Sequence, residues 1–374
     1  MNKVYLSNLN SLRAIAACMV IISHLLNNKT KLGQHLGHFG GLGVTIFFTL
    51  SGFLITYLLL AEQEKFKTIK VKDFYIRRAL RIWPLYFLVL LFTYILIPFI
   101  IPSYYQKEIN RFNFNSVLLN IFFLTNVTLI LKMTPLIIRV IWSIGIEEQF
   151  YIFWPWVIKL KQKWRNKIIF LIILAIPALK FLFMALNKFT SIELYQTISS
   201  ILSVTRFDAM AVGGLFGILG YSKELKVLKF TFKLENFFGK NMQLLVFGLA
   251  FFSIIITSYS SDFFNIVNFL INPWLFGFCI LNLSINKAPL FNIENKTMNY
   301  LGKISFGLYL IHQIVIYFLL YYLVPYLKEF NPIIKDITMF IATFSLTILI
   351  AHLSYTTYEK RFINLKSKFS YIKT

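Results

Sequence analysis

The chain has few charged residues. Only 14% of its 374 residues are Asp, Glu, Lys or Arg, against roughly 25% in soluble globular domains. Acidic residues are the scarcer kind, with 15 Asp and Glu against 38 Lys and Arg. Hydrophobic residues make up 57% of the chain, and the mean hydropathy is +0.68. These proportions argue against a soluble domain and favour an integral membrane protein.

Cysteines and linkers are also scarce. Both cysteines, Cys18 and Cys279, lie within apolar segments, which gives no indication of a disulfide framework or a thiolate metal site. No stretch rich in Gly, Ser or Pro divides the chain. We therefore expect one membrane domain over residues 1–374, with no soluble C-terminal extension.

Long apolar runs predict an all-α polytopic bundle of about ten transmembrane helices, because crossing the hydrocarbon core takes about 20 helical residues. A further apolar stretch, residues 117–131, is shorter and carries Asn120 and Asn126, which favours a re-entrant or interfacial segment. The expected spans are 10–27, 41–62, 82–102, 142–160, 166–186, 203–220, 243–258, 263–284, 303–325 and 334–354.

The basic residues indicate an orientation. With both termini in the cytoplasm and 117–131 not crossing, 27 of the 38 Lys and Arg residues fall in inside segments and nine in outside segments. This asymmetry agrees with the positive-inside rule. It also explains the formal net charge of +23 through contact with anionic lipid, so no nucleic-acid partner is expected.

The first span carries two ionisable residues, Arg13 and His24. Eleven residues make almost three helical turns, so both side chains share one helix face, roughly 16 Å apart along the axis. A histidine within a span is suited to general-base work near neutral pH. The alternatives are that Arg13 is a membrane anchor and His24 a packing residue.

Three arginines, Arg77, Arg78 and Arg81, stand at the start of the third span. Arg78 and Arg81 are three residues apart on one helical face, and Arg77 lies one turn before Arg81. Such a set of donors suits phosphate groups at the cytoplasmic edge of the membrane. The alternative is an anchor for lipid headgroups.

The fourth and sixth spans hold further polar residues. The segment Trp142-Ser143 precedes Glu147, a carboxylate inside a span and therefore a candidate functional residue; Trp142 could equally belong to an interfacial aromatic belt. Arg206 lies within the sixth predicted span, and Glu147 is its expected partner because Asp208, two residues away, would point elsewhere on a helix. This pair could equally be a structural lock between helices.

The ninth span places Tyr309 and His312 on one helix face with Ser305, which predicts a polar stripe facing a cavity. His35 and His38 occupy a short outside loop. Two histidines without a further ligand do not make a metal site, so no metal is expected.

Together these segments resemble acyltransferase family 3, the membrane O-acyltransferases that modify bacterial surface polysaccharides. The resemblance rests on Arg13 with His24, the run from Gly43 to Ile55, the run from Arg78 to Pro84, Trp142-Ser143 with Glu147, Arg206 with Gly213, and the run from Leu308 to His312. These features occur in the family's order along nearly the whole chain.

The resemblance implies a protein of the bacterial cytoplasmic membrane that transfers an acyl group, expected to be acetyl, from cytoplasmic acyl-CoA to a lipid-linked or surface glycan. It implies that Arg13 and His24 are essential. We expect His24 to act as the base, and Arg77, Arg78 and Arg81 to hold the CoA phosphates while the pantetheine arm enters past Arg13. Glu147 completes the expected catalytic set by orienting or charge-balancing His24, or by pairing with Arg206.

We expect Trp142, Ser143, Arg206, Tyr309 and His312 to line the substrate path, in one channel that joins Arg13 to His24. The sequence does not decide whether Glu147 pairs with His24 or with Arg206. Longer family members carry an outside hydrolase-like domain that this chain is expected to lack, which leaves open a separate outside or assembly protein as a partner. The alternative function is a transporter or flippase for a glycan or its precursor.

Overall fold

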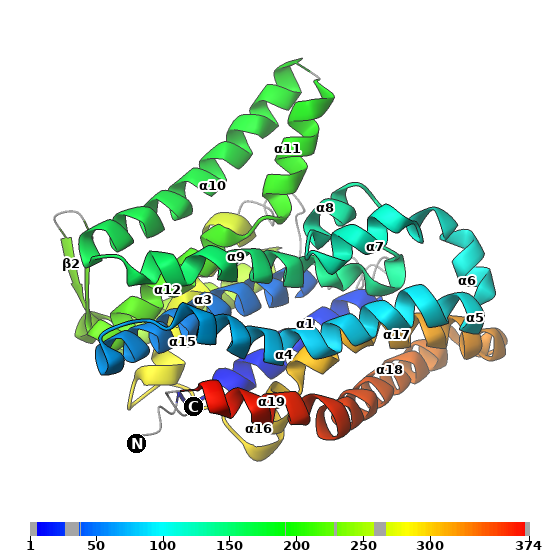
Figure 1. Cartoon of the computed structure of the whole chain (residues 1–374). Helices are drawn as coiled ribbons and strands as arrows, with labels where there is room; N and C mark the ends of the chain where they lie inside the picture. Colours follow the sequence, from blue (N-terminus) through cyan, green and yellow to red (C-terminus); the bar gives the residue numbers. More distant parts are fainter. Residues whose placement is uncertain are drawn as a thin grey trace.

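The computed structural model describes residues 6–26, 37, 39–190, 192–227, 230–257 and 267–370. These residues form a helical bundle (Figure 1). The longer helices are α1 (Leu9–Leu26), α3 (Phe39–Phe66), α4 (Val71–Leu91), α9 (Trp142–Lys159), α10 (Gln162–Thr190), α11 (Glu193–Val204), α12 (Phe207–Ser222), α13 (Lys240–Thr257), α15 (Asn272–Ile285), α17 (Ser305–Tyr322) and α18 (Pro332–Ser354).

Shorter helical segments connect these helices. They include α5 (Ile97–Ile100), α6 (Pro102–Lys107), α7 (Phe114–Ile121), α8 (Thr125–Ile130), α16 (Lys296–Lys303) and α19 (Lys360–Lys366). Two π-helical turns, Phe92–Leu96 and Tyr355–Glu359, continue α4 and α18, and short 3-10 turns cover Ile109–Arg111, Leu136–Ile141, Leu234–Phe237, Val324–Leu327 and Ser367–Phe369. The only described strands, β1 (Glu224–Val227) and β2 (Phe230–Lys233), pair as an antiparallel hairpin after α12.

The described residues contain seven helices long and apolar enough to cross a membrane: 9–26, 39–66, 71–100, 162–190, 193–222, 305–322 and 332–369, where several merge adjacent segments. An all-α membrane bundle is therefore confirmed, and the chain is a multi-pass membrane protein. Seven of the ten predicted spans overlap these seven helices. The other three overlap α13 and α15, which are shorter apolar helices, and α9, which carries Glu147, Glu148 and Lys159. Of the predicted spans, residues 27, 258 and 263–266 lie outside the described part.

The stretch 117–131 does not form one helix. It is divided between α7 and α8, of eight and six residues, with Phe123 at a positive φ of 58° between them. Neither helix has the length of a transmembrane span. This break agrees with the predicted non-crossing segment.

The centre of the bundle is a close contact between α3 and α12. A Cβ atom at Gly52 would lie 1.8 Å from the Met210 carbonyl oxygen, and one at Gly213 would lie 1.9 Å from the Thr49 carbonyl oxygen. Only glycine fits at these two positions, since each facing atom belongs to a backbone. Small residues at such contacts let membrane helices approach closely.

We therefore expect Gly213→Ala to destabilise the protein by about 1–3 kcal/mol or more, the usual cost of overpacking, because neither backbone can move without separating α3 from α12. Thermal unfolding in detergent would occur several degrees lower. Gly248→Ala is the matched control, because nothing lies within 4 Å of a Cβ atom there. Equal unfolding temperatures for the two variants would contradict this account of the core.

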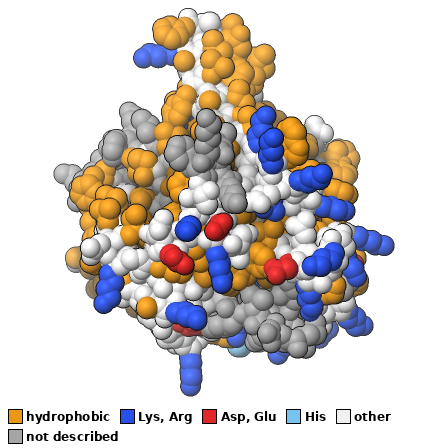
Figure 2. Space-filling model, turned by 90° about the vertical axis from the view of Figure 1, so that its left-hand side faces the viewer, with side chains coloured by type: hydrophobic (Ala, Val, Ile, Leu, Met, Phe, Trp, Pro, Cys, Tyr) orange, Lys and Arg blue, Asp and Glu red, His pale blue; other side chains and the backbone are white. Residues whose placement is uncertain are grey.

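The flank of the bundle formed by α10 is apolar, whereas the end that carries the β-hairpin is basic. Figure 1 shows α10 and α11 projecting from the rest as a hairpin, and α10 exposes apolar residues such as Leu171, Leu174 and Leu182. Figure 2 shows that Lys and Arg side chains outnumber Asp and Glu on the end that carries the β-hairpin. An apolar flank and a basic end are what contact with lipid and with an anionic membrane face would require.

Candidate active site

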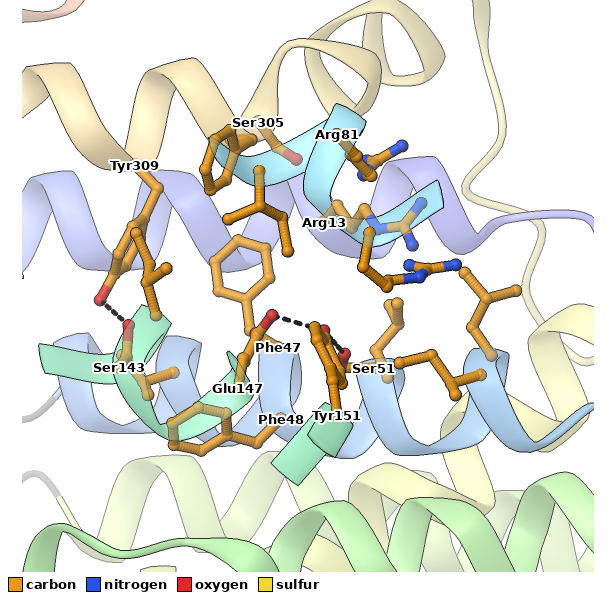
Figure 3. Close-up of a pocket in the computed structure, with 18 residues that line it drawn as sticks. Arg13, Phe47, Phe48, Ser51, Arg81, Ser143, Glu147, Tyr151, Ser305 and Tyr309 are labelled. Atoms are coloured by element: carbon orange, nitrogen blue, oxygen red, sulfur yellow. Dashed lines mark hydrogen bonds between the residues drawn. The ribbon is translucent and has the colours of Figure 1, made fainter. Parts of the chain in front are cut away.

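A cavity lies within the bundle between α1, α3, α4, α9 and α17 (Figure 3). Its walls combine apolar side chains of α3, such as Phe47, Phe48 and Leu54, with polar groups from the other four helices. Six of the eleven site residues predicted from the sequence line it together. They are Arg13, Arg78, Arg81, Ser143, Glu147 and Tyr309.

Figure 3 shows the guanidinium groups of Arg13 and Arg81 at one end of this cavity. Arg78 also lines the cavity, and its charge acts on Arg13 together with that of Arg81. Arg13 donates to Asn10 at 3.3 Å, and the buried Nε of Arg78 has no hydrogen-bond partner among the described residues. None of these three arginines forms an ion pair with a described residue at salt-bridge distance. Among the lining residues only Glu147 is acidic, and its charge acts on all three. Three cations facing one carboxylate leave positive charge that an anionic ligand would neutralise.

Arg77 does not join this group. It points to the other side of α4, where its Nη2 pairs with the buried Glu62 carboxylate at 2.7 Å and its Nη1 donates to the Phe369 carbonyl oxygen at 2.8 Å. Successive helical residues differ by about 100° in direction, so Arg77 and Arg78 face different surroundings. The cavity therefore receives two arginines from α4, and not the three that the sequence predicted.

The carboxylate of Glu147 lies at the middle of the cavity and ends a short chain of hydrogen bonds. The Tyr151 hydroxyl donates to Glu147 Oε2 at 2.7 Å and lies 2.6 Å from the Ser51 hydroxyl. The Arg78 guanidinium lies over the Tyr151 ring, 5.9 Å from its centre. The sequence analysis missed Tyr151 and Ser51, although Tyr151 follows Glu147 by one helical turn.

Ser143 and Tyr309 form the opposite end of the cavity (Figure 3). Their hydroxyl oxygens lie 2.7 Å apart, and Tyr309 also donates to the Val140 carbonyl oxygen at 3.1 Å. The Val140 amide in turn donates to the side chain of Gln313. These contacts join α9 and α17 and hold the Tyr309 ring in place.

Beyond Tyr309 lies a pair of histidines, His24 on α1 and His312 on α17. The Nε2 atom of His312 lies 3.1 Å from Nδ1 of His24. Each Nδ1 atom also approaches a backbone carbonyl oxygen of its own helix, Val20 at 3.0 Å and Leu308 at 3.2 Å. Since a carbonyl oxygen only accepts, each neutral ring carries its proton on Nδ1.

These hydrogen bonds determine the protonation of Nε2, the second ring nitrogen of His24. Nε2 of His312 is unprotonated and accepts from His24 Nδ1–H, which leaves His24 Nε2 as an unprotonated nitrogen with no hydrogen-bond partner among the described residues. A histidine held in one tautomer by its other nitrogen is arranged as a proton acceptor. His312 is itself fully buried and orients His24.

The predicted single channel from Arg13 to His24 is not continuous in this structure. Neither histidine belongs to the cavity lining. The ring of Tyr309 stands between the two parts, with its centre 5.7 Å from that of Phe47 in the cavity and 6.1 Å from that of His312. The aromatic rings of Tyr309 and Phe47 therefore separate an arginine cavity from a histidine pair.

Two other predicted residues lie away from the cavity lining. Trp142 packs edge-on against Phe48, with ring centres 6.1 Å apart. Arg206 lies in a buried polar cluster where it donates to Thr45 and to the Asn268 carbonyl oxygen. Both residues support the walls of α3, which carries part of the cavity lining.

The expected pairing of Arg206 with Glu147 is wrong. Arg206 Nε lies 3.6 Å from the Asp208 carboxylate, while Glu147 bonds to Tyr151. Residues 206 and 208 do not belong to one helix, as that pairing required, because Arg206 is the residue before α12, with φ −115° and ψ 37°. Outside the helix its side chain is free to turn back towards Asp208. Glu147 accordingly pairs with neither of the two partners considered.

No cluster of three or more His, Cys, Asp or Glu residues suited to a metal ion occurs within the described ranges. His35 and His38, considered above as weak ligands, lie outside those ranges.

The fold and this cavity define a multi-pass membrane protein with an interior cationic site. Residues 6–354 match the family model described as an acyltransferase domain, so the chain belongs to acyltransferase family 3. The features that carried the resemblance all lie within the matched residues.

Relatives of the chain carry consistent names. The chain is 29% identical over 96% of its length to a putative O-acetyltransferase of Staphylococcus aureus, of which the match covers 57%. It is 31% identical over 44% of its length to the peptidoglycan O-acetyltransferase OatA of Listeria monocytogenes, covering 26% of that protein. It is also 31% identical over 40% of its length to the putative peptidoglycan O-acetyltransferase YrhL of Bacillus subtilis, covering 23%. No solved structure matches the chain.

Proposed function

We propose that this chain transfers an acetyl group from acetyl-CoA, bound at the arginine cavity, to a hydroxyl group of a cell-envelope glycan. The observation that carries the proposal is the arrangement of three arginines without ion-pair partners, one aromatic layer away from a histidine with an unprotonated nitrogen. The family supports acyl transfer. The names of the relatives support an acetyl group and peptidoglycan as the acceptor.

The arginines provide the donor site. Acyl-CoA carries several phosphate charges at one end of a long flexible arm and the thioester at the other. Guanidinium groups bind phosphate through paired, charge-assisted hydrogen bonds, so Arg78 and Arg81 would hold the phosphates. Arg13 would then contact the inner part of the arm, and the basic end of the bundle would face the cytoplasm, where acetyl-CoA is made.

The separation of Arg13 and His24 along α1 is the distance that the pantetheine arm of acetyl-CoA would have to span. Arg13 and His24 are separated by roughly 16 Å along the helix, a distance suited to an extended pantetheine arm. The thioester would arrive at the aromatic layer, where Tyr309 and Ser143 must part from each other to admit it. Separating them breaks one hydrogen bond at a net cost of about 1 kcal/mol.

His24 would act as the general base. Its Nε2 removes the proton of the acceptor hydroxyl while the hydroxyl oxygen attacks the thioester carbonyl carbon, forming a new C–O bond. The C–S bond then breaks, and the protonated imidazole returns the proton to the CoA sulfur. Glu147 would balance the charge of Arg13 and of the other cavity arginines, with Tyr151 holding its carboxylate in place.

The direct test is mass spectrometry of envelope glycans from cells with and without the gene. We expect ester-linked acetyl groups on a glycan of the first cells, and their loss without any loss of the glycan itself. Unchanged acetylation together with loss of surface glycan would overturn the proposal and favour a glycan carrier. The glycan fragment that bears the ester identifies the acceptor.

A further inference from the structure

The C-terminal segment lies against the cationic end of the cavity. After α18 ends at Ser354, the π-helical turn Tyr355–Glu359 leads into α19 and then into the 3-10 turn Ser367–Phe369. Both α19 and this last turn pack against α4, the helix that carries Arg78 and Arg81 (Figure 1). This segment follows residue 354, where the match to the family model ends.

Specific contacts hold this segment in place. The Phe369 carbonyl oxygen accepts a 2.8 Å hydrogen bond from Arg77, and Arg77 is itself fixed by its buried ion pair with Glu62. At the start of the segment, the Ser354 hydroxyl donates to the buried Glu359 at 2.9 Å. The bond from Ser354 stabilises the turn that begins the segment, and Arg77 attaches the end of the segment to α4 from the side that faces away from the cavity.

This attachment places Lys366 on a segment that packs against α4, the helix of Arg78 and Arg81. Lys366 stands three residues before Phe369, which contacts Arg77, and its side chain is half-buried. Burial acts on its ammonium group first, and then the positive charges of Arg81, Arg78 and Arg13. No carboxylate of the described residues pairs with Lys366. Lys368, two residues later, is exposed.

Holding a fourth cation beside three arginines is unfavourable without an anion, because like charges repel and partial burial weakens the screening by water. A ligand with several negative charges at one end reverses that balance. We propose that α19 is part of the donor site and that Lys366 binds a phosphate group of acyl-CoA together with Arg78 and Arg81. This inference rests on the proposed function, which supplies the ligand.

The test compares Lys366→Gln with Lys368→Gln, which removes the same charge two residues away. Binding of acetyl-CoA to the purified full-length protein is measured by titration in detergent. A charge-assisted hydrogen bond is worth roughly 1.5–3 kcal/mol, so we expect binding to weaken by about tenfold or more for Lys366→Gln. Binding should change by less than about twofold for Lys368→Gln and for Lys366→Arg.

S-acetylpantetheine, which lacks the nucleotide phosphates, separates phosphate binding from a structural effect. We expect the wild type and Lys366→Gln to use it equally well as an acetyl donor. A loss with this donor as large as the loss with acetyl-CoA would overturn the inference, since a distorted site would impair both donors.

A measurement on the wild type does not depend on the folding of any variant. Lysines are modified with an amine-reactive reagent in the presence and absence of CoA, and the modified positions are identified by mass spectrometry. We expect CoA to protect Lys366 and not Lys368; equal modification in both conditions overturns the inference. If the wild type binds no acetyl-CoA at all, the proposed function itself fails, which is a different result from binding that Lys366 does not influence.

Discussion

Replacing His24 by glutamine is expected to reduce glycan acetylation by about 10²–10⁴-fold, the usual contribution of a general base. Glutamine is polar and of similar length, but it cannot accept a proton at neutral pH. Because His24 lies outside the arginine cavity, acetyl-CoA binding should stay within about twofold of the wild-type value. Acetyl transfer and donor binding are measured on the same purified sample.

The matched control is His352→Gln. His352 lies on the exposed side of α18, where its ring contacts the Tyr300 hydroxyl, so its replacement should leave transfer unchanged. Full activity in His24→Gln would contradict the proposed base. Loss of acetyl-CoA binding in that variant would instead indicate that His24 contributes to holding the donor, and the loss of transfer could then not be assigned to the base alone.

His312 has a different role from His24. It accepts from His24 Nδ1–H and thereby fixes the tautomer that leaves Nε2 of His24 unprotonated. It is a positioning residue, since its own second nitrogen is occupied by the Leu308 carbonyl oxygen. Replacing His312 should therefore reduce acetyl transfer less than replacing His24, because the Val20 carbonyl oxygen still accepts from Nδ1 of His24.

Much of this arrangement could be predicted from the sequence. Apolar runs of helical length located every helix that lines the cavity, and the i, i+3 spacing of Arg78 and Arg81 placed both on one side of α4. The rarity of ionisable residues within spans singled out Arg13 and Glu147, which the structure brings to one cavity. In a membrane, the high cost of buried charge makes such residues conspicuous.

Side-chain partners could not be predicted from the sequence where they depend on local backbone geometry or on segments distant in the chain. The pairing of Arg206 with Asp208 could not be predicted, because nothing in the sequence shows that α12 begins at Phe207, directly after Arg206. The partner of Arg77 is Glu62, on the preceding helix, and Lys366 belongs to a segment almost 300 residues away from Arg78. The position of the Tyr309 ring, between the arginine cavity and the histidine pair, likewise depends on how the helices pack together.

The second large effect is expected at the phosphate site. Replacing both Arg78 and Arg81 by glutamine should weaken acetyl-CoA binding by about 10²–10⁴-fold, because each charge-assisted hydrogen bond contributes roughly 1.5–3 kcal/mol. Thermal stability of the unliganded protein should stay the same or rise, since neither arginine has an ion-pair partner among the described residues and like charges are removed. Titration with acetyl-CoA and thermal unfolding in detergent measure the two quantities.

The control for this pair is Arg361→Gln on the exposed side of α19, which removes a positive charge of the same segment outside the cavity and should leave acetyl-CoA binding unchanged. Raising the salt concentration should weaken binding to the wild type more than to the double variant, because fewer charged contacts remain to be screened. Unchanged binding in the double variant would exclude Arg78 and Arg81 as the phosphate ligands. A double variant that loses binding and unfolds at a lower temperature would instead give these arginines a structural role, since a ligand site built from unpaired cations can lose its ligand without losing stability.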